Sequence, residues 1–196
     1  YSTVAAQGFA GYDTAYQPAR FFMFGGPNGG GWGAGRNWDG ENALICLGDG
    51  DTRSTPMEII EAKYPLQILK YALIPDSGGA GQFRGGLGLT VVYKLLRGEQ
   101  LSAVFVCGRC KFPAFGLHGG QDARPSDIYI TRNGKPGPCT CQAAGLPLQV
   151  GDVITVNAGG GGGYGDPALR DRALVQQDLA LGYISAATAK AVYGVG

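Results

Sequence analysis

Glycine makes up 36 of the 196 residues, and 20 of these glycines fall in three runs, 25–40, 78–88 and 159–165. Glycine loses the most conformational freedom on folding, so such runs indicate positive φ angles or close approaches of backbone. They lack the strict three-residue period of collagen. They also contain large side chains that flexible linkers lack, namely Trp32, Trp38, Phe83, Leu87 and Tyr164. The sequence therefore predicts ordered glycine-rich loops, or short polyproline-II segments packed side by side, with aromatic anchors.

The charge balance excludes several classes of protein. Sixteen basic and 15 acidic residues give a formal net charge of +1, with no basic stripe for a nucleic-acid partner. No apolar stretch approaches the roughly 20 residues that cross a bilayer, and no signal peptide is evident. We expect a soluble, cytoplasmic protein that binds neither nucleic acid nor membrane. Since the chain begins at Tyr1, we also expect a processed chain or a fragment, with sequence or partners on its N-terminal side.

Short apolar or alternating stretches predict a mainly β chain. Arg97, Gly98 and Glu99 predict a hairpin between two of them, and Asn133-Gly134 predicts a type I′ turn. The expected strands are 43–47, 57–63, 65–74, 87–96, 101–106, 127–131 and 152–158.

The C-terminal part has helical signals. Asp166-Pro167 predicts a single turn, and Asp171 caps a helix that ends at Gly182. Ser185 caps a second helix over 186–193. The apolar stripe of the first helix consists of Leu174, Val175, Leu179 and Leu181. We expect a glycine-rich β domain over 1–165 and a helical hairpin over 166–196 that docks on it.

The segment 75–88, Pro-Asp-Ser-Gly-Gly-Ala-Gly-Gln-Phe-Arg-Gly-Gly-Leu-Gly, resembles the hydantoinase B/oxoprolinase family. Further matching segments occur in the expected order, and together they cover nearly the whole chain. These segments are 56–61, 64–66, 112–120, 163–167 and 193–195.

The resemblance implies that the chain is the C-terminal third of a B-type subunit. It implies barrel-like sheets that run into a polyproline-II bundle. It also implies a hetero-oligomer with a hydantoinase-A-like partner that binds ATP and Mg, and a catalytic divalent metal in the absent N-terminal remainder. The implied activity is ATP-dependent hydrolysis of a cyclic amide, as in N-methylhydantoinase or oxoprolinase. A ketone carboxylase of the acetone or acetophenone type and a non-catalytic glycine-rich assembly module stay open as alternatives.

The backbone of Ser77, Gly78 and Gly79 could form an anion-binding nest, to which Arg84 would add a bidentate donor. The alternative is that these glycines allow close backbone packing, while Asp76 and Arg84 pair with each other or cap turns. No Gly-Lys-Ser/Thr phosphate-loop ending is present in the sequence. Asp76, Arg84 and His118 are the catalytic candidates. His118 is the only histidine, and its alternative is a structural or solvent-facing role.

Cysteine and carboxylate clusters raise the question of metal sites. Cys107, Cys110, Cys139 and Cys141 form two closely spaced pairs that could bind one structural zinc, or could be ordinary reduced thiols. The odd total of five cysteines favours either reading over a secreted disulfide framework. A second group consists of Asp49, Asp51, Glu58 and Glu61. In a strand, Glu58 and Glu61 would face opposite sides, so we expect a solvated or ion-paired surface there.

Overall fold

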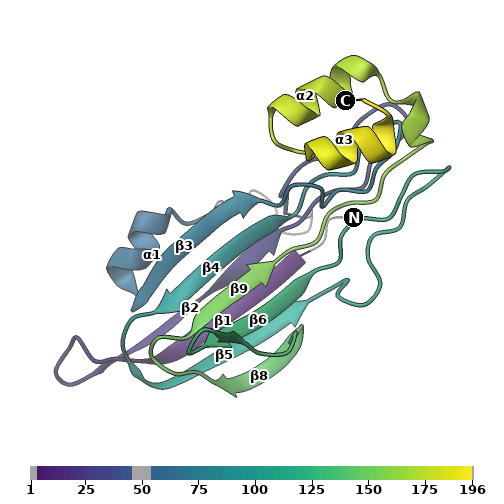
Figure 1. Ribbon diagram of the computed structural model, residues 1–196. Helices are drawn as coiled ribbons and strands as arrows, with labels where there is room; N and C mark the ends of the chain where they lie inside the picture. The colour runs from purple at the N-terminus through teal and green to yellow at the C-terminus, as the bar shows by residue number, and fades with distance from the viewer. Residues whose placement is uncertain (1–3, 46–53, 196) are drawn as a thin grey trace.

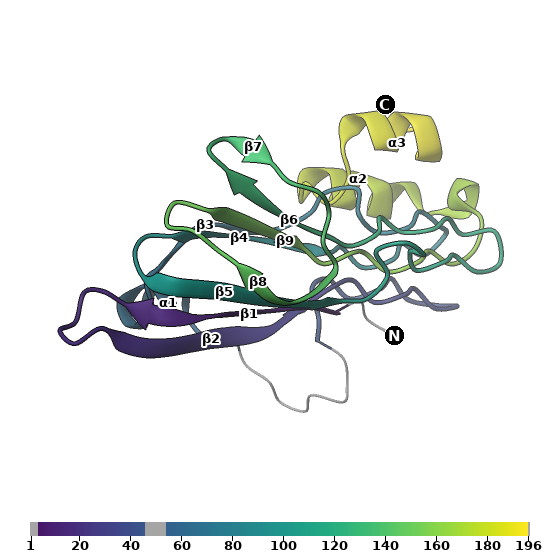
Figure 2. The same ribbon diagram turned by 90° about the horizontal axis from the view of Figure 1, so that it is seen from below.

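The computed structural model describes residues 4–45 and 54–195, which form two antiparallel sheets packed face to face (Figures 1 and 2). One sheet has the order β2-β1-β5-β8 and the other the order β3-β4-β9-β6-β7. The first consists of β1 (Val4–Asp13), β2 (Arg20–Gly29), β5 (Glu99–Cys107) and β8 (Gln142–Pro147). The second consists of β3 (Leu66–Leu73), β4 (Leu89–Leu95), β6 (Asp127–Arg132), β7 (Lys135–Pro136) and β9 (Val153–Asn157).

The hydrophobic core lies between the two sheets. Successive strand residues point to opposite faces, and β1 alternates accordingly between partly exposed and buried positions. Phe9 and Phe105 from one sheet meet Tyr93 and Ile154 from the other, all at most 3% exposed. The mainly β prediction is confirmed, but the expected barrel-like closure is wrong. The sheets stay open, because β2 and β3 are edge strands that do not pair with each other. Helix α1 (Met57–Lys63) packs against the core, as does Tyr64, whose ring lies on Phe22 and Phe24 of β2.

Several predicted strands form where local signals are strong. Residues 65–74 and 152–158 contain β3 and β9, and β6 extends one residue beyond the predicted 127–131. Asn133 and Gly134 have the positive φ angles of a tight turn, 52° and 76°. The predicted hairpin through 97–99 is wrong, because β4 and β5 belong to different sheets. Gly98 (φ 132°) and Gln100 (φ 50°) direct the chain across to the opposite sheet instead of back along β4.

The strand predicted over 57–63 is also wrong, because this segment forms α1. Met57 and Ile60 recur at a spacing of three, which places both on the side that packs against the core. Glu58 and Glu61 consequently share a helical face instead of lying on opposite sides of a strand. The predicted strand at 43–47 lies partly outside the described residues, and its described part, 43–45, is not a strand.

Beyond the ends of the sheets, the three glycine runs lie side by side (Figure 1). Backbone hydrogen bonds join them: Gly31 N–H donates to Gly159, Gly86 N–H to Trp32 and Gly161 N–H to Gly86. A Cβ at Gly161 would overlap the carbonyl of Trp32, so a side chain there is excluded by the neighbouring backbone. We call residues 30–42, 77–88, 115–124 and 159–165 the glycine bundle. These hydrogen bonds agree with the prediction of ordered glycine-rich loops. The polyproline-II conformation of the segments stays a prediction.

The predicted C-terminal helices form and lie across the glycine bundle (Figures 1 and 2). They are the 3-10 helix η2 (Pro167–Leu169), α2 (Arg172–Ala180) and α3 (Ala186–Tyr193). Asp166, Asp171 and Ser185 cap them as expected, and Gly194 ends α3 in the left-handed conformation. The domain boundary at residue 165 stays a prediction. None of the described helices is long and apolar enough to span a bilayer.

Candidate functional site

The predicted anion nest lies inside the glycine bundle, where Ser77 Oγ and Gly79 N–H have hydrogen-bond partners within the chain. Ser77 is fully buried; its hydroxyl donates to the carbonyl of Ile74 (2.6 Å) and accepts from Gly88 N–H (2.8 Å). Gly79 N–H donates to the carbonyl of Gly161 (2.8 Å). A Cβ at Gly78 would overlap the carbonyl of Gly85, and one at Gly79 would overlap that of Gln121, so close backbone packing explains both glycines. Anion binding at Ser77, Gly78 and Gly79 stays a prediction.

Arg84 is buried and points toward the C-terminal helices. Its Nε lies 3.3 Å from Asp178 Oδ2, and its Nη1 donates to the carbonyl of Gly85 (2.6 Å). Its guanidinium also lies 5.2 Å from the ring centroid of Tyr183. With 4% of its surface exposed, Arg84 holds two parts of the chain together in this structure. The sequence-level alternative of an Asp76–Arg84 pair does not form.

Arg170 completes a buried network that the sequence analysis missed. Its Nη1 and Nη2 atoms each lie 2.7 Å from an oxygen of Asp39, and Nη2 also lies 2.8 Å from Asp178. Burial disfavours the charged form of Asp39, but hydrogen bonds and charge from Arg170 outweigh it and lower the pKa of Asp39. Burial likewise favours neutral Arg170, yet the two carboxylates raise the pKa of its guanidinium. No local signal reveals this network, because Arg170 and Asp39 are 131 residues apart.

Asp76 also connects the glycine bundle to the C-terminal helices, through Tyr183 and Ser185. It is exposed, has a left-handed backbone (φ 58°), and its carboxylate accepts from Ser185 N–H at 2.9 Å. Asp76 N–H also donates to the carbonyl of Tyr183 (3.0 Å). Asp76 therefore binds the N-cap residue of α3.

His118 lies at the surface of the glycine bundle. It is exposed, has φ 52°, and its ring packs on Tyr164 with 4.9 Å between centroids. Among the described residues, no carboxylate accepts a hydrogen bond from this imidazole. The structure therefore does not bring Asp76, Arg84 and His118 together as one constellation, and their catalytic roles stay predictions.

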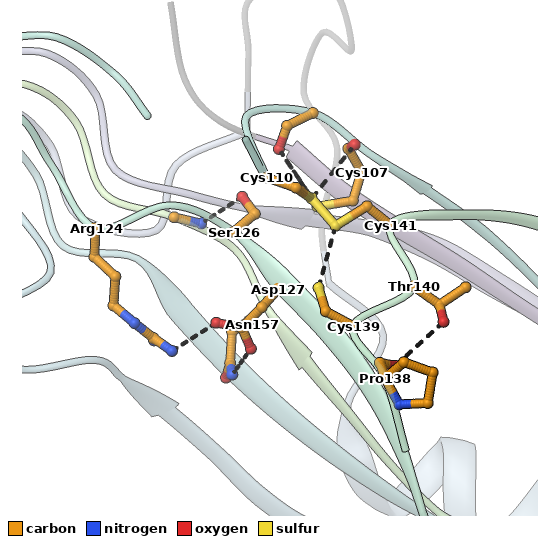
Figure 3. Close-up of a disulfide and its surroundings, with 12 residues drawn as sticks. Cys107, Cys110, Arg124, Ser126, Asp127, Pro138, Cys139, Thr140, Cys141 and Asn157 are labelled. Carbon is orange, nitrogen blue, oxygen red and sulfur yellow. Dashed lines mark hydrogen bonds and ion pairs between the residues drawn. A yellow bond between two sulfur atoms is a disulfide. The ribbon is translucent and has the colours of Figure 1, made fainter. Parts of the chain in front are cut away.

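The four cysteines do come together where β5, β6 and β8 begin or end (Figure 3). Cys110 and Cys141 form a disulfide, which differs from the reduced thiols expected from the sequence. Cys107 is a buried free thiol and Cys139 an exposed one, with its Sγ 3.6 Å from Sγ of Cys141. Two of the four sulfurs are thus unavailable as thiolates, and no group of three or more metal-ligating side chains occurs in the described part of the chain. The structural zinc stays a prediction that requires the reduced chain.

The acidic group gives no metal site either. Asp49 and Asp51 lie outside the described residues. Glu58 and Glu61 are exposed on α1, and the Glu61 carboxylate accepts from Ile68 N–H at 2.7 Å. Glu61 therefore ties α1 to β3, in line with the expected solvated or paired surface.

A second polar cluster that the sequence analysis missed lies in the core. Gln7 Nε2 donates to the hydroxyl of Tyr93 (2.9 Å), and Asn28 Nδ2 donates to Gln7 Oε1 (2.6 Å). Burial raises the pKa of the Tyr93 phenol, so this group stays protonated. The three side chains border a cavity of about 200 Å³ that Tyr71 and Met57 also line. Three buried polar residues on strands are a signal that could have marked this position.

Comparison with known proteins places this geometry in a family. The hydantoinase B/oxoprolinase profile matches residues 1–167. The chain belongs to the hydantoinase B/oxoprolinase family. It is 36% identical over 173 residues to the caprolactamase subunit beta of Pseudomonas jessenii, a match that covers 83% of this chain and 29% of that subunit.

Two solved structures have a similar fold. The crystal structure of the ATP-dependent caprolactamase from Pseudomonas jessenii matches 98% of this chain and 35% of its own chain, with a TM-score of 0.75 and 27% identity. An acetone carboxylase structure matches 97% of this chain and 29% of its own, with a TM-score of 0.76 and 20% identity. The chain thus spans about a third of these relatives.

Proposed function

We infer that this chain forms part of the B-type subunit of an ATP-dependent cyclic-amide hydrolase. The observation that carries this inference is the 36% identity to caprolactamase subunit beta across 83% of the chain. The glycine bundle supports it, because the family segment 75–88 supplies the backbone that packs between the other runs. The acetone carboxylase structure, similar in fold, keeps ATP-dependent ketone carboxylation as the second candidate.

In this proposal the chain supports an active site whose catalytic groups come from the rest of the B-type subunit and from its partner. Among the described residues, no carboxylate pairs with His118, whose ring packs on Tyr164, and Gly79 N–H of the predicted nest donates to Gly161. ATP and Mg would bind a hydantoinase-A-like partner, and a catalytic divalent metal would lie in the N-terminal remainder of the subunit. A purely non-catalytic assembly module is the third candidate, and an inactive complete assembly would favour it.

An exposed apolar surface supports packing against further protein. Tyr12 pairs with Phe21, Ala10 with Met23 and Ser102, and Ala6 with Val106, so these side chains share the side of the sheet that faces away from the core. We call this the outer sheet face. Met23 is 72% and Val106 60% exposed, and a hollow of about 610 Å³ lies between Met23, Val104 and Ile59.

Exposed apolar side chains that gather on one sheet face are typical of an interaction site. We assign it to the N-terminal remainder of the B-type subunit, because the chain spans only about a third of its relatives. Hetero-oligomers of whole A-type and B-type subunits then form through other surfaces.

The experiment is a substrate assay of the complete assembly. The full B-type subunit, coexpressed with its ATP-binding partner, is supplied with ATP, Mg and either a hydantoin or lactam, or a ketone with bicarbonate. We expect ATP hydrolysis coupled to ring opening. If ATP hydrolysis instead required the ketone together with bicarbonate and did not occur with the hydantoin or lactam, the proposed activity would be ketone carboxylation. The 196-residue chain alone should hydrolyse no ATP, and turnover by it would contradict the assignment of ATP to a partner.

A further inference from the structure

The sulfur atoms of Cys110, Cys139 and Cys141 are arranged as a disulfide with a third, exposed sulfur beside it (Figure 3). Cys139 Sγ lies 3.6 Å from Sγ of Cys141, the sulfur that is bonded to Cys110. This separation is close to sulfur–sulfur contact, and thiol–disulfide exchange begins with a thiolate in this position. We propose that Cys110, Cys139 and Cys141 form a thiol–disulfide exchange site with Cys139 as the attacking thiol.

The backbone around these sulfurs is held from two sides. Cys107 N–H donates to the carbonyl of Cys141 (2.9 Å), which fixes that residue to the end of β5. Thr140 N–H donates to the carbonyl of Ile128 (2.7 Å), which fixes the same segment to β6. Residues 139–141 therefore stay in place while their sulfur atoms change partners.

The exchange balances without an external oxidant. Cys139 loses its proton to solvent, and its thiolate attacks Sγ of Cys141. A Cys139–Cys141 bond forms as the Cys110–Cys141 bond breaks, and Cys110 leaves as a thiolate that takes up a proton. One thiol and one disulfide are present before and after.

Cys107 takes no part in this reaction. Its side chain is 4% exposed, and burial raises the pKa of its thiol, which lowers its thiolate fraction at neutral pH. Cys139 is the exposed free thiol of the described chain. This contrast supplies a matched pair of variants, Cys139→Ser and Cys107→Ser.

The exchange releases a surface loop. In the observed form, the disulfide joins Cys110, at the start of the loop between β5 and β6, to the beginning of β8. That loop presents Phe112 (74% exposed) and Phe115 (65% exposed). Once Cys110 is released, the covalent connection between this apolar loop and β8 is lost.

Tryptic peptide mapping distinguishes the two disulfides. Cleavage after Arg109, Lys111, Arg132 and Arg170 places Cys110 in the dipeptide 110–111 and both Cys139 and Cys141 in peptide 133–170. The chain is held without reductant at a pH of about 8, quenched with acid, alkylated and digested. The observed disulfide joins the two peptides, whereas exchange leaves an internal disulfide in 133–170 and an alkylated Cys110.

We expect wild type and Cys107→Ser to show both disulfides. Cys139→Ser should show only the Cys110–Cys141 disulfide, with alkylation of Cys110 reduced roughly tenfold or more, because the attacking thiol is gone. A wild-type chain with no more alkylated Cys110 than Cys139→Ser would overturn the proposal. Purification without oxygen of a chain with all four thiols reduced and about one zinc bound would also overturn it, because no disulfide would then be present to exchange.

Discussion

Arg170 and Asp39 form a bidentate ion pair, with both N–O distances at 2.7 Å, that joins the C-terminal helices to the glycine bundle. Asp178 lies against the same guanidinium and also accepts from Arg84. The helices therefore dock on the glycine bundle through buried charges, whereas their small apolar cluster of Val175, Ile184 and Ala189 packs the helices against each other. This differs from the sequence analysis, which relied on the apolar stripe. Of that stripe, Val175 is buried whereas Leu181 is 54% exposed.

Replacing Arg170 should destabilise the fold strongly. Arg170→Ala leaves Asp39 without its bidentate partner and Asp178 with Arg84 alone, and breaking a buried pair typically costs about 3–5 kcal/mol. Urea unfolding followed by tryptophan fluorescence measures the change. Exposed Arg172, two residues further on, is the control, and Arg172→Ala should change the free energy of unfolding by about 0.5 kcal/mol or less. Equal effects of the two substitutions would contradict the role of the network.

Acid should destabilise the chain through buried carboxylates. Burial opposes ionisation of Asp152, but hydrogen bonds from Arg132 and Gln149 N–H prevail and lower its pKa. A lowered folded pKa adds stability that is fully present above the unfolded value of about 4 and is lost as the pH falls through the folded pKa.

We therefore expect a constant urea midpoint between pH 5 and 8 and a fall below about pH 4. Asp152→Asn should be less stable at neutral pH and should lose less on acidification. Exposed Glu99→Gln serves as the control and should retain the wild-type pH profile. A profile for Asp152→Asn parallel to wild type would show that this carboxylate does not contribute.

Gly161 should tolerate no side chain. Its Cβ would overlap the carbonyl of Trp32, and one at Gly79 would overlap that of Gln121. Gly161→Val or Gly79→Val should each cost a few kcal/mol, because the neighbouring backbone must move. Gly26 is the matched control, since its Cβ would meet nothing within 4 Å. Thermal unfolding compares the variants, and a melting temperature for Gly161→Val equal to that of Gly26→Val would refute close packing at this position.

The features that the sequence predicted correctly depend on neighbouring residues. The turn at Asn133-Gly134, the caps at Asp171 and Ser185, and the stop at Gly194 each follow from the conformational preferences of a few adjacent residues. The family resemblance, carried by residues 75–88, was likewise confirmed by the profile match.

The features that were missed depend on distant residues. The segment 97–99 looks like a hairpin locally, yet strand partners are chosen by the core between two sheets. The Cys110–Cys141 disulfide forms because β5 and β8 are neighbours, which the spacing of the cysteines does not reveal. The helix α1 has only seven residues, too few for periodicity to separate it from a strand.

The second C-terminal helix should be needed for assembly with the ATP-binding partner. We expect Tyr193 to Gly196 to lie near a subunit boundary, so deletion of 185–196 from the complete subunit should reduce copurification of the partner. The deletion also removes the Ser185 N–H that donates to Asp76. Asp76→Ala loses that contact but keeps α3. It therefore distinguishes weaker docking of α3 on the glycine bundle from weaker assembly with the ATP-binding partner. Undiminished copurification with normal activity after the deletion would leave α3 as a cover for the glycine bundle.

The outer sheet face should be buried in the complete B-type subunit. Val104 and Val150 are exposed to similar degrees in this chain, 45% and 54%, but only Val104 lies on that face. In the complete subunit, Val104→Asp would place an unpaired charge in an apolar interface. It should lower the free energy of unfolding by more than the roughly 1 kcal/mol spanned by strand propensities. Val150→Asp, in the turn before β9, should stay within about 0.5 kcal/mol. Denaturant unfolding of the complete subunit measures both, and a Val104→Asp effect no larger than that of Val150→Asp would show that the rest of the subunit packs elsewhere.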